Sequence, residues 1–160
     1  MAVIKEIQLL DIGLCDPFRE ELIRRSTVDR SAPSHNVGGW RTHDDLFLWD
    51  YEPVRWLYLQ IQHYLLSIEI LGWGIVNRRG SYHQRHHHMR PGYHWSGIFY
   101  LDDSPTPTVF DPDGTAERTG DPFYITAERN KLVIFPSEIW HWVEPHTADE
   151  PRVTVAFDAR

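Results

Sequence analysis

The sequence predicts one mainly β domain, in which a jelly roll or small barrel is supported by N-terminal helices. Three observations lead to this fold class. The chain has 160 residues, which suits one domain and excludes two full-sized ones. Its first half contains two stretches with helical signals, and from residue 70 onward short runs of β-branched and aromatic residues alternate with turn formers. We therefore expect helical and loop support over residues 1–69 and a β core over residues 70–160.

The N-terminal part begins with a short alternating stretch over residues 3–10. Asp16 and Pro17 then open the first predicted helix, because Asp is a favoured N-cap and Pro a favoured first helical residue. This helix is expected to end near Arg25. After a turn-rich loop, residues 53–67 show apolar side chains at helical spacing, which predicts a second helix. Both helices are expected to lie against one face of the β core.

The remainder of the chain reads as strands. Each predicted strand is a short run rich in β-branched and aromatic residues, and Gly, Pro, Asp or Asn separates it from the next. Eight such runs are present, at residues 70–78, 81–89, 94–102, 106–110, 122–126, 131–135, 139–144 and 152–157. Eight short strands at this spacing are typical of a jelly roll or a small barrel.

Composition and charge exclude several functional classes. Sixteen Lys and Arg against 23 Asp and Glu give a net charge of -7, the wrong sign for tracking nucleic acid or an acidic membrane surface. The longest uncharged helical stretch, residues 56–68, is too short to span a bilayer. The first residues lack a secretory pattern, so we expect a cytoplasmic protein. The single cysteine, Cys15, can form neither an internal disulfide nor a zinc–thiolate cluster.

The ten histidines are the most informative residues. His86 and His88 lie two positions apart on a predicted strand, so their side chains share a face and could bind one metal ion. His141 follows the apolar stretch that ends in Phe135-Pro136-Ser137, and it could add a third imidazole. Three imidazoles would leave positions open on a metal for a substrate and dioxygen.

Three neighbouring side chains are expected on the opposite face of the same strand. They are His83, Arg85 and His87, which alternation separates from His86 and His88. We interpret them as surface or packing residues.

Arg152 is predicted to face the interior of the barrel. In the last strand it shares a face with Thr154, opposite the apolar side chains of Val153, Val155 and Phe157. An inward-facing guanidinium needs an anion, and its planar fork matches a carboxylate. The alternative is an arginine at the rim that pairs with an Asp or Glu.

Together these residues resemble the iron(II)- and 2-oxoglutarate-dependent oxygenases, in particular their small members with an H-x-H pair and an FPSxxxH ending. The resemblance covers roughly residues 37–157, and its motifs occur in the family's order. The matching positions are Gly38-Gly39-Trp40, Gly72-Trp73, Asn77, His86, His88, residues 96–101, Phe110-Asp111-Pro112, Phe135-Pro136-Ser137, His141 and Arg152. The resemblance implies a cupin-like double-stranded β-helix, one Fe(II) and 2-oxoglutarate.

The resemblance also implies roles for individual residues. The implied iron ligands are His86, His88 and His141, and Arg152 would bind the distal carboxylate of 2-oxoglutarate. Tyr100, Asn77 and Thr154 are further candidate contacts of 2-oxoglutarate. Most members of the superfamily have Asp or Glu where this chain has His88. An alternative therefore places His88 outside the coordination sphere, with Asp111 or a water molecule completing it.

The expected reaction is hydroxylation of a small molecule by O2, with an amino acid or a natural-product intermediate as the substrate. The candidate substrate contacts are Trp73, Tyr82, Arg90, Tyr93, Trp95 and Asp111. Among these, Arg90 and Asp111 could pair with a zwitterion.

Two other functional classes are compatible with the same residues. One is a cupin-type three-histidine dioxygenase or isomerase that does not use 2-oxoglutarate and would not need Arg152. The other is a non-catalytic domain that binds a small acid without iron. Short edge strands and exposed aromatic residues are also compatible with a homodimer.

Overall fold

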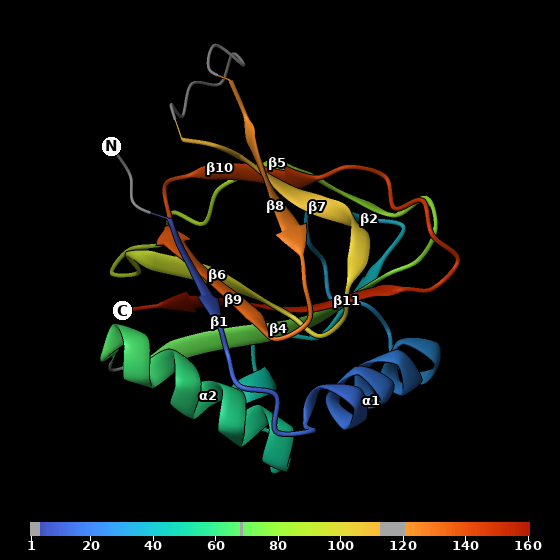
Figure 1. Cartoon of the computed structure of the whole chain (residues 1–160), viewed down its shortest axis with the longest axis horizontal. Helices are drawn as coiled ribbons and strands as arrows, with labels where there is room; N and C mark the ends of the chain where they lie inside the picture. Colours follow the sequence, from blue (N-terminus) through green and yellow to red (C-terminus); the bar gives the residue numbers. More distant parts are fainter. Residues whose placement is uncertain (1–3, 68, 113–120) are drawn as a thin grey trace.

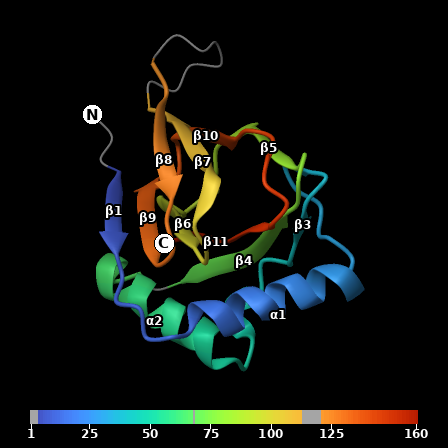
Figure 2. The same cartoon turned by 45° about the vertical axis from the view of Figure 1, so that its right-hand side comes forward.

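The computed structural model describes residues 4–67, 69–112 and 121–160 and contains two antiparallel β-sheets that face each other (Figures 1 and 2). The larger sheet has the strand order β1-β9-β6-β11-β4-β3, and the smaller one has the order β2-β5-β10-β7-β8. The sheet strands are β1 (Lys5–Gln8), β2 (Asn36–Val37), β3 (Trp40–Arg41), β4 (Ile70–Asn77), β5 (Tyr82–His86), β6 (Trp95–Tyr100), β7 (Ser104–Asp111), β8 (Phe123–Ala127), β9 (Lys131–Pro136), β10 (Trp140–Val143) and β11 (Arg152–Ala159). This architecture confirms the predicted fold class.

Two helices cover the outer face of the larger sheet (Figure 2). Helix α1 (Cys15–Val28) and helix α2 (Glu52–Leu65) bury Leu22 and Leu57 completely against the sheet, and the 3-10 helix η1 (Leu46–Leu48) lies beside β4. Burial of such apolar side chains stabilises the layer by roughly 1.5–3 kcal/mol each. The prediction that both helices lie against one face is confirmed.

The start of α1 differs from the prediction. The residue before the helix is Leu14, and its side chain makes no capping hydrogen bond. Asp16 instead lies inside the first turn, where its carboxylate forms an ion pair with Arg129. A negative charge there also interacts favourably with the helix dipole. The helix therefore begins two residues before the predicted start.

Eight strands, β4 to β11, follow the eight predicted runs of the β core. Sequence reasoning missed β2 and β3, which are only two residues long and are too short to show periodicity. Strand β1 lies within the predicted stretch 3–10, of which residue 3 is outside the described residues. In the described part of the chain no helix is both long and apolar enough to cross a membrane.

Strand β11 lies in the middle of the larger sheet, between β6 and β4, and its two faces contact different parts of the interior. Its Val155 and Phe157 belong to the core beneath the helices, whereas Arg152, Thr154 and Ala156 line a cavity on the opposite face, between the sheets. This alternation confirms the two faces predicted for the strand.

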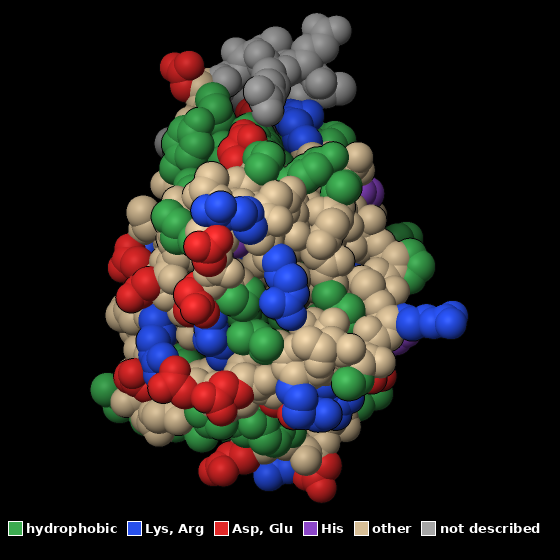
Figure 3. All heavy atoms as spheres, turned by 90° about the vertical axis from the view of Figure 1, so that its right-hand side faces the viewer, with side chains coloured by type: hydrophobic (Ala, Val, Ile, Leu, Met, Phe, Trp, Pro, Cys, Tyr) green, Lys and Arg blue, Asp and Glu red, His purple; other side chains and the backbone are tan. Residues whose placement is uncertain are grey.

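The molecular surface carries mixed charge. On the face shown in Figure 3, acidic and basic side chains lie interspersed. The surplus of acidic residues thus does not gather into a single patch on this face.

Candidate functional site

Three histidines converge between the two sheets. One ring nitrogen from each of His86, His88 and His141 lies within 4.8 Å of the other two. His86 ends β5 and is directly paired with His141 on β10. His88 lies beyond the end of β5, where its backbone N–H donates to the carbonyl of Ser137 at 2.9 Å. The predicted strand included both His86 and His88, whereas β5 ends at His86 and His88 lies outside it.

Each of the three rings is held through Nδ1. The Nδ1 of His86 is 2.7 Å from the carbonyl oxygen of Gln84, and that of His141 is 3.0 Å from the carbonyl oxygen of Ile139. The Nδ1 of His88 is 2.8 Å from the carboxylate of Asp158. Because each acceptor oxygen needs an N–H, this arrangement places the proton on Nδ1 and leaves the lone pair of Nε2 available.

The environment keeps the imidazoles of His86 and His141 neutral. Burial, with a further contribution from nearby His88, holds the pKa of His141 well below its usual range. Burial and the neighbouring imidazoles also lower the pKa of His86. Neutral imidazole is the form that binds metal ions, and Nε2 of His88 is buried without a hydrogen-bond partner. The three residues therefore fit a divalent transition metal.

Arg152 is the second component of the site. Its side chain is held by Nε–H donation to the carbonyl of Thr106 at 3.1 Å and by Nη2–H donation to Oγ1 of Thr108 at 2.9 Å. Its residue exposure is only 1%, and among the described residues no carboxylate lies within ion-pair distance of it. Burial lowers the pKa of Arg152, although arginine stays charged in proteins. A buried, charged guanidinium without a protein counter-ion favours an anionic ligand.

One cavity of about 370 Å³ contains both components. Its size is in the range of small-molecule sites. None of the residues lining it is acidic. Besides the three histidines and Arg152, its lining includes Trp73, Thr154, Arg90, Arg41, His83 and Thr108. The cavity therefore combines metal-binding nitrogens with positive charge.

The structure brings some predicted contacts to this cavity. Thr154 and Arg90 line it, and Trp73 lines it while stacking on the ring of His88 at 5.5 Å between centroids. Tyr100 lies behind the cavity, with its hydroxyl 2.6 Å from Oγ1 of Thr108. Its ring centroid lies 5.4 Å from Cζ of Arg152.

Other predicted contacts lie elsewhere. Asn77 pairs in register with Arg152, but its side chain lies beside Asn36 and Gly39. Tyr93 donates its hydroxyl to Glu69. The remaining residues outside the cavity lining are Tyr82, Trp95 and Asp111.

Asp111 is occupied by another partner. Its carboxylate is almost fully buried and pairs with Arg85 at 2.8 Å. The alternative in which Asp111 completes the coordination in place of His88 is therefore not favoured, because His88 itself belongs to the converging group.

His83 and His87 were expected on the face opposite His86 and His88, and both instead line the cavity. His87 follows the end of β5, where the alternation of a strand no longer applies. For His83 the reason is a register shift between β5 and β10: His141 pairs with His86, whereas Val143 pairs with His83. The extra residue of this bulge brings positions three apart to the same side. The Nε2 of His83 is buried without a hydrogen-bond partner, and burial with nearby Arg152 holds the pKa of His83 well below its usual range.

Sequence reasoning also missed Arg41 and Asp158. Arg41 is on the two-residue strand β3, and its guanidinium lies 4.6 Å from the centroid of the Trp73 ring. Asp158 lies on the face of β11 that also carries Arg152 and Thr154, so alternation along this strand could have identified it.

Comparisons with known proteins agree with this geometry. The family described as "Putative 2OG-Fe(II) oxygenase" matches residues 72–158, which include every residue of the histidine group and Arg152. No curated protein sequence matches this chain.

Several solved structures share the fold. A prolyl-4-hydroxylase from Pseudomonas putida is 18% identical, with a TM-score of 0.72, and the match covers 98% of this chain and 91% of that one. A prolyl hydroxylase from Trichoplax adhaerens, in complex with a peptide fragment, is 12% identical, with a TM-score of 0.78 and coverage of 98% and 82%. HygX from Streptomyces hygroscopicus, with nickel, 2-oxoglutarate and hygromycin B bound, is 14% identical, with a TM-score of 0.70 and coverage of 99% and 82%.

Proposed function

This chain belongs to the 2OG-Fe(II) oxygenase family, and from that premise we propose that it oxidises a small molecule with O2 while 2-oxoglutarate is oxidatively decarboxylated. The enzyme class and its cofactors, Fe(II) and 2-oxoglutarate, follow from the family. The substrate class and the residue assignments are our proposal. The observation that carries them is the convergence of three available imidazole nitrogens and a buried, unpaired guanidinium in one cavity.

In this proposal Nε2 of His86, His88 and His141 would hold the iron. Their Nδ1 contacts fix the orientation of all three rings before the metal arrives. When bound, Fe(II) together with 2-oxoglutarate supplies the two-electron oxidation by O2. The protein supplies the binding, the orientation and the exclusion of water.

Arg152 would bind the distal carboxylate of 2-oxoglutarate. Its Nε and Nη2 are already anchored on Thr106 and Thr108, so the guanidinium is held in place without the ligand. Thr154, two positions along β11, faces the same cavity and is the second proposed contact. His83 is a third, because its unpartnered Nε2 is buried in the same lining.

The cavity favours a small substrate that carries an anionic or strongly polar group. Its volume of about 370 Å³ must accommodate 2-oxoglutarate as well as the part of the substrate that reacts. Trp73 provides an apolar wall next to His88, and Arg41 and Arg90 add positive charge. An amino acid or a natural-product intermediate with a carboxylate fits these walls, with Arg90 as the proposed polar contact.

The test is an anaerobic titration of metal-free protein with Fe(II) and then with 2-oxoglutarate, monitored by the visible iron-to-keto-acid charge-transfer band. We expect the band in the wild type and its loss in Arg152→Leu, which keeps all three histidines. Bound iron without a band in the wild type would contradict the assignment and favour the cupin-type alternative. A band of full strength in Arg152→Leu would contradict the role of Arg152.

A further inference from the structure

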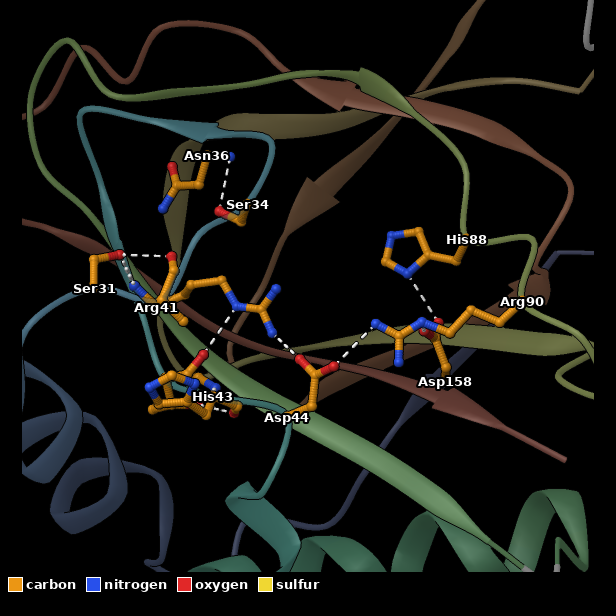
Figure 4. A network of polar contacts seen from close by, with 12 residues as sticks. Ser31, Ser34, Asn36, Arg41, His43, Asp44, His88, Arg90 and Asp158 are labelled. Atoms are coloured by element: carbon orange, nitrogen blue, oxygen red, sulfur yellow. Dashed lines mark hydrogen bonds and ion pairs between the residues drawn. The ribbon is translucent and has the colours of Figure 1, made fainter.

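Asp158 is a buried carboxylate directly behind the proposed metal ligands. It is on β11, its exposure is 0%, and its backbone neighbours across the sheet are Ser96 of β6 and Leu71 of β4. Figure 4 shows its side chain between His88 and Arg90. Leaving a carboxylate inside a protein is costly unless its oxygens find partners, so its contacts are informative.

The contacts of Asp158 hold one carboxylate oxygen firmly. Oδ1 accepts hydrogen bonds from Nδ1 of His88 at 2.8 Å and from the hydroxyl of Ser96 at 2.7 Å. The Ser96 hydroxyl is itself 2.9 Å from that of Ser137. Oδ2 makes no hydrogen bond and lies 3.6 Å from Nε of Arg90. The carboxylate is therefore fixed with Oδ1 directed at the imidazole of His88.

This contact distinguishes His88 from the other two histidines. His86 and His141 place Nδ1 on neutral backbone carbonyls, whereas His88 places it on a charged oxygen. His88 also lies outside β5, so its orientation depends more on the hydrogen bond of its side chain than that of His86 or His141 does. A carboxylate that accepts from a metal-bound imidazole fixes the ring and raises the basicity of its other nitrogen.

We propose that Asp158 is a positioning residue that supplies, through the imidazole of His88, the negative charge that three neutral ligands lack. The inference rests on the proposed function, because it takes His86, His88 and His141 as the ligands. It predicts that metal affinity depends on the charge of Asp158 and not only on the volume of its side chain.

The charge of Asp158 is in turn connected to the cavity lining. Arg90 lies against Oδ2 of Asp158 and also donates from Nη2 to Asp44 at 2.9 Å, and Asp44 forms an ion pair with Arg41 as well (Figure 4). Arg90 partly neutralises Asp158, so removing this cation should make the carboxylate more effective. The two residues therefore have opposite expected effects on metal affinity.

The first experiment measures the affinity of metal-free protein for Co(II), a spectroscopic substitute for Fe(II), by calorimetry and by its visible ligand-field spectrum. Asp158→Asn keeps the size of the side chain and an acceptor oxygen but removes the charge. We expect affinity about 10–100-fold weaker and an altered spectrum. The matched control is Asp111→Asn, which makes the same change at a buried carboxylate paired with Arg85, and it should change affinity much less.

The second experiment is a double-mutant cycle with Arg90→Gln, a change at a partly exposed side chain. Arg90→Gln should tighten Co(II) binding in the wild-type background and have a smaller effect in Asp158→Asn. If Asp158→Asn does not fold, Arg90→Gln is compared with Arg41→Gln, which removes the same charge from the same cavity. A larger gain in affinity for Arg90→Gln supports the proposal, and equal gains overturn it.

Failure of this inference is distinguishable from failure of the proposed function. Unchanged Co(II) affinity and spectrum in a folded Asp158→Asn protein, with the wild type still binding Co(II) and 2-oxoglutarate, would overturn the role of Asp158 alone. A wild-type protein that binds no Co(II) would overturn the ligand assignment and the inference with it. An unchanged Co(II) affinity of the His141→Ala protein would do the same.

Discussion

Thr108 lines the cavity and connects two buried polar side chains. Its Oγ1 accepts from Nη2 of Arg152 at 2.9 Å and lies 2.6 Å from the hydroxyl of Tyr100. All three side chains are essentially inaccessible to solvent, so each lost hydrogen bond leaves a buried group without a partner. Tyr100 is thus connected to Arg152 through Thr108, and its ring centroid also lies 5.4 Å from Cζ of Arg152. We predict that its hydroxyl supports the position of Arg152 and does not contact 2-oxoglutarate.

We expect Thr108→Val to weaken 2-oxoglutarate binding about tenfold, because a hydrogen bond to a charged group contributes about 1.5–3 kcal/mol. Metal affinity should stay unchanged, since Thr108 touches none of the three histidines in the described contacts. Calorimetric titration of the Co(II)-loaded protein with 2-oxoglutarate measures the effect.

The matched variant is Tyr100→Phe, which removes the outer hydroxyl and leaves the bond from Arg152 to Thr108 intact. Its loss of affinity should be smaller. A Tyr100→Phe protein that loses as much affinity as Thr108→Val would show that the tyrosine contacts the ligand directly.

At the scale of elements, the close approach of β6 and β11 depends on a glycine. A side chain at Gly97 would place its Cβ 2.1 Å from the ring of Phe157 and 2.7 Å from the backbone oxygen of Val133. Contacts under 3.0 Å require movement, and a backbone oxygen in the middle of a sheet has little freedom to move. Gly97 thus permits the packing of the strand that carries Arg152 and Asp158.

Gly97→Ala is expected to destabilise the protein by about 3 kcal/mol, the upper part of the range for overpacking. Gly74→Ala is the control on β4, because the nearest atoms to its added Cβ all belong to the side chain of Leu22 and none is a backbone oxygen. Urea unfolding of both variants provides the comparison. Equal losses of stability would contradict the argument from the backbone contact.

At the scale of the whole molecule, the two sheets enclose several imidazoles that burial keeps uncharged. Burial holds the pKa of His83 and His141 well below the usual range, and it lowers the pKa of His86. In the unfolded chain each of these groups takes up a proton near pH 6.5. The metal-free protein should therefore be most stable above this pH.

The free energy of unfolding of metal-free protein should fall as the pH drops below about 6.5, because the unfolded state then binds more protons than the folded state. The slope that each such histidine contributes is about half of 1.4 kcal/mol per pH unit at pH 6.5 and approaches about 1.4 kcal/mol per pH unit at lower pH, and the loss continues down to the low pKa of the folded state. Urea unfolding between pH 7.5 and 5.5, in the presence of a chelator, measures this slope.

His141→Gln should reduce that slope by about half a proton on average between pH 7.5 and 5.5, because it removes one of the groups that titrate near pH 6.5 only in the unfolded chain. A slope identical to that of the wild type would contradict the assignment of this proton to His141. Adding Co(II) at pH 7.5 should raise the stability of the wild type, since a ligand that binds only the folded state stabilises it.

Much of the molecule can be read from local sequence. The eight strands of the core and the two helices follow from periodicity and turn residues, with errors of a few residues at their ends. Alternation along β11 predicted the inward face that carries Arg152 and Thr154, and the family followed from motifs in a fixed order. These features depend on residues that are close in the chain.

Only the tertiary structure decided which other side chains reach the cavity. His83 lines the cavity because β5 has a bulge opposite β10. Arg41 lines it from β3, a strand of two residues that is too short to predict. Asp158 forms a hydrogen bond with His88, which is 70 residues away in the sequence. Asp111 was expected at the site but forms an ion pair with Arg85 instead. The period of a strand determines the face of a residue, but register shifts and partners across sheets depend on packing between distant segments, and no local pattern records that packing.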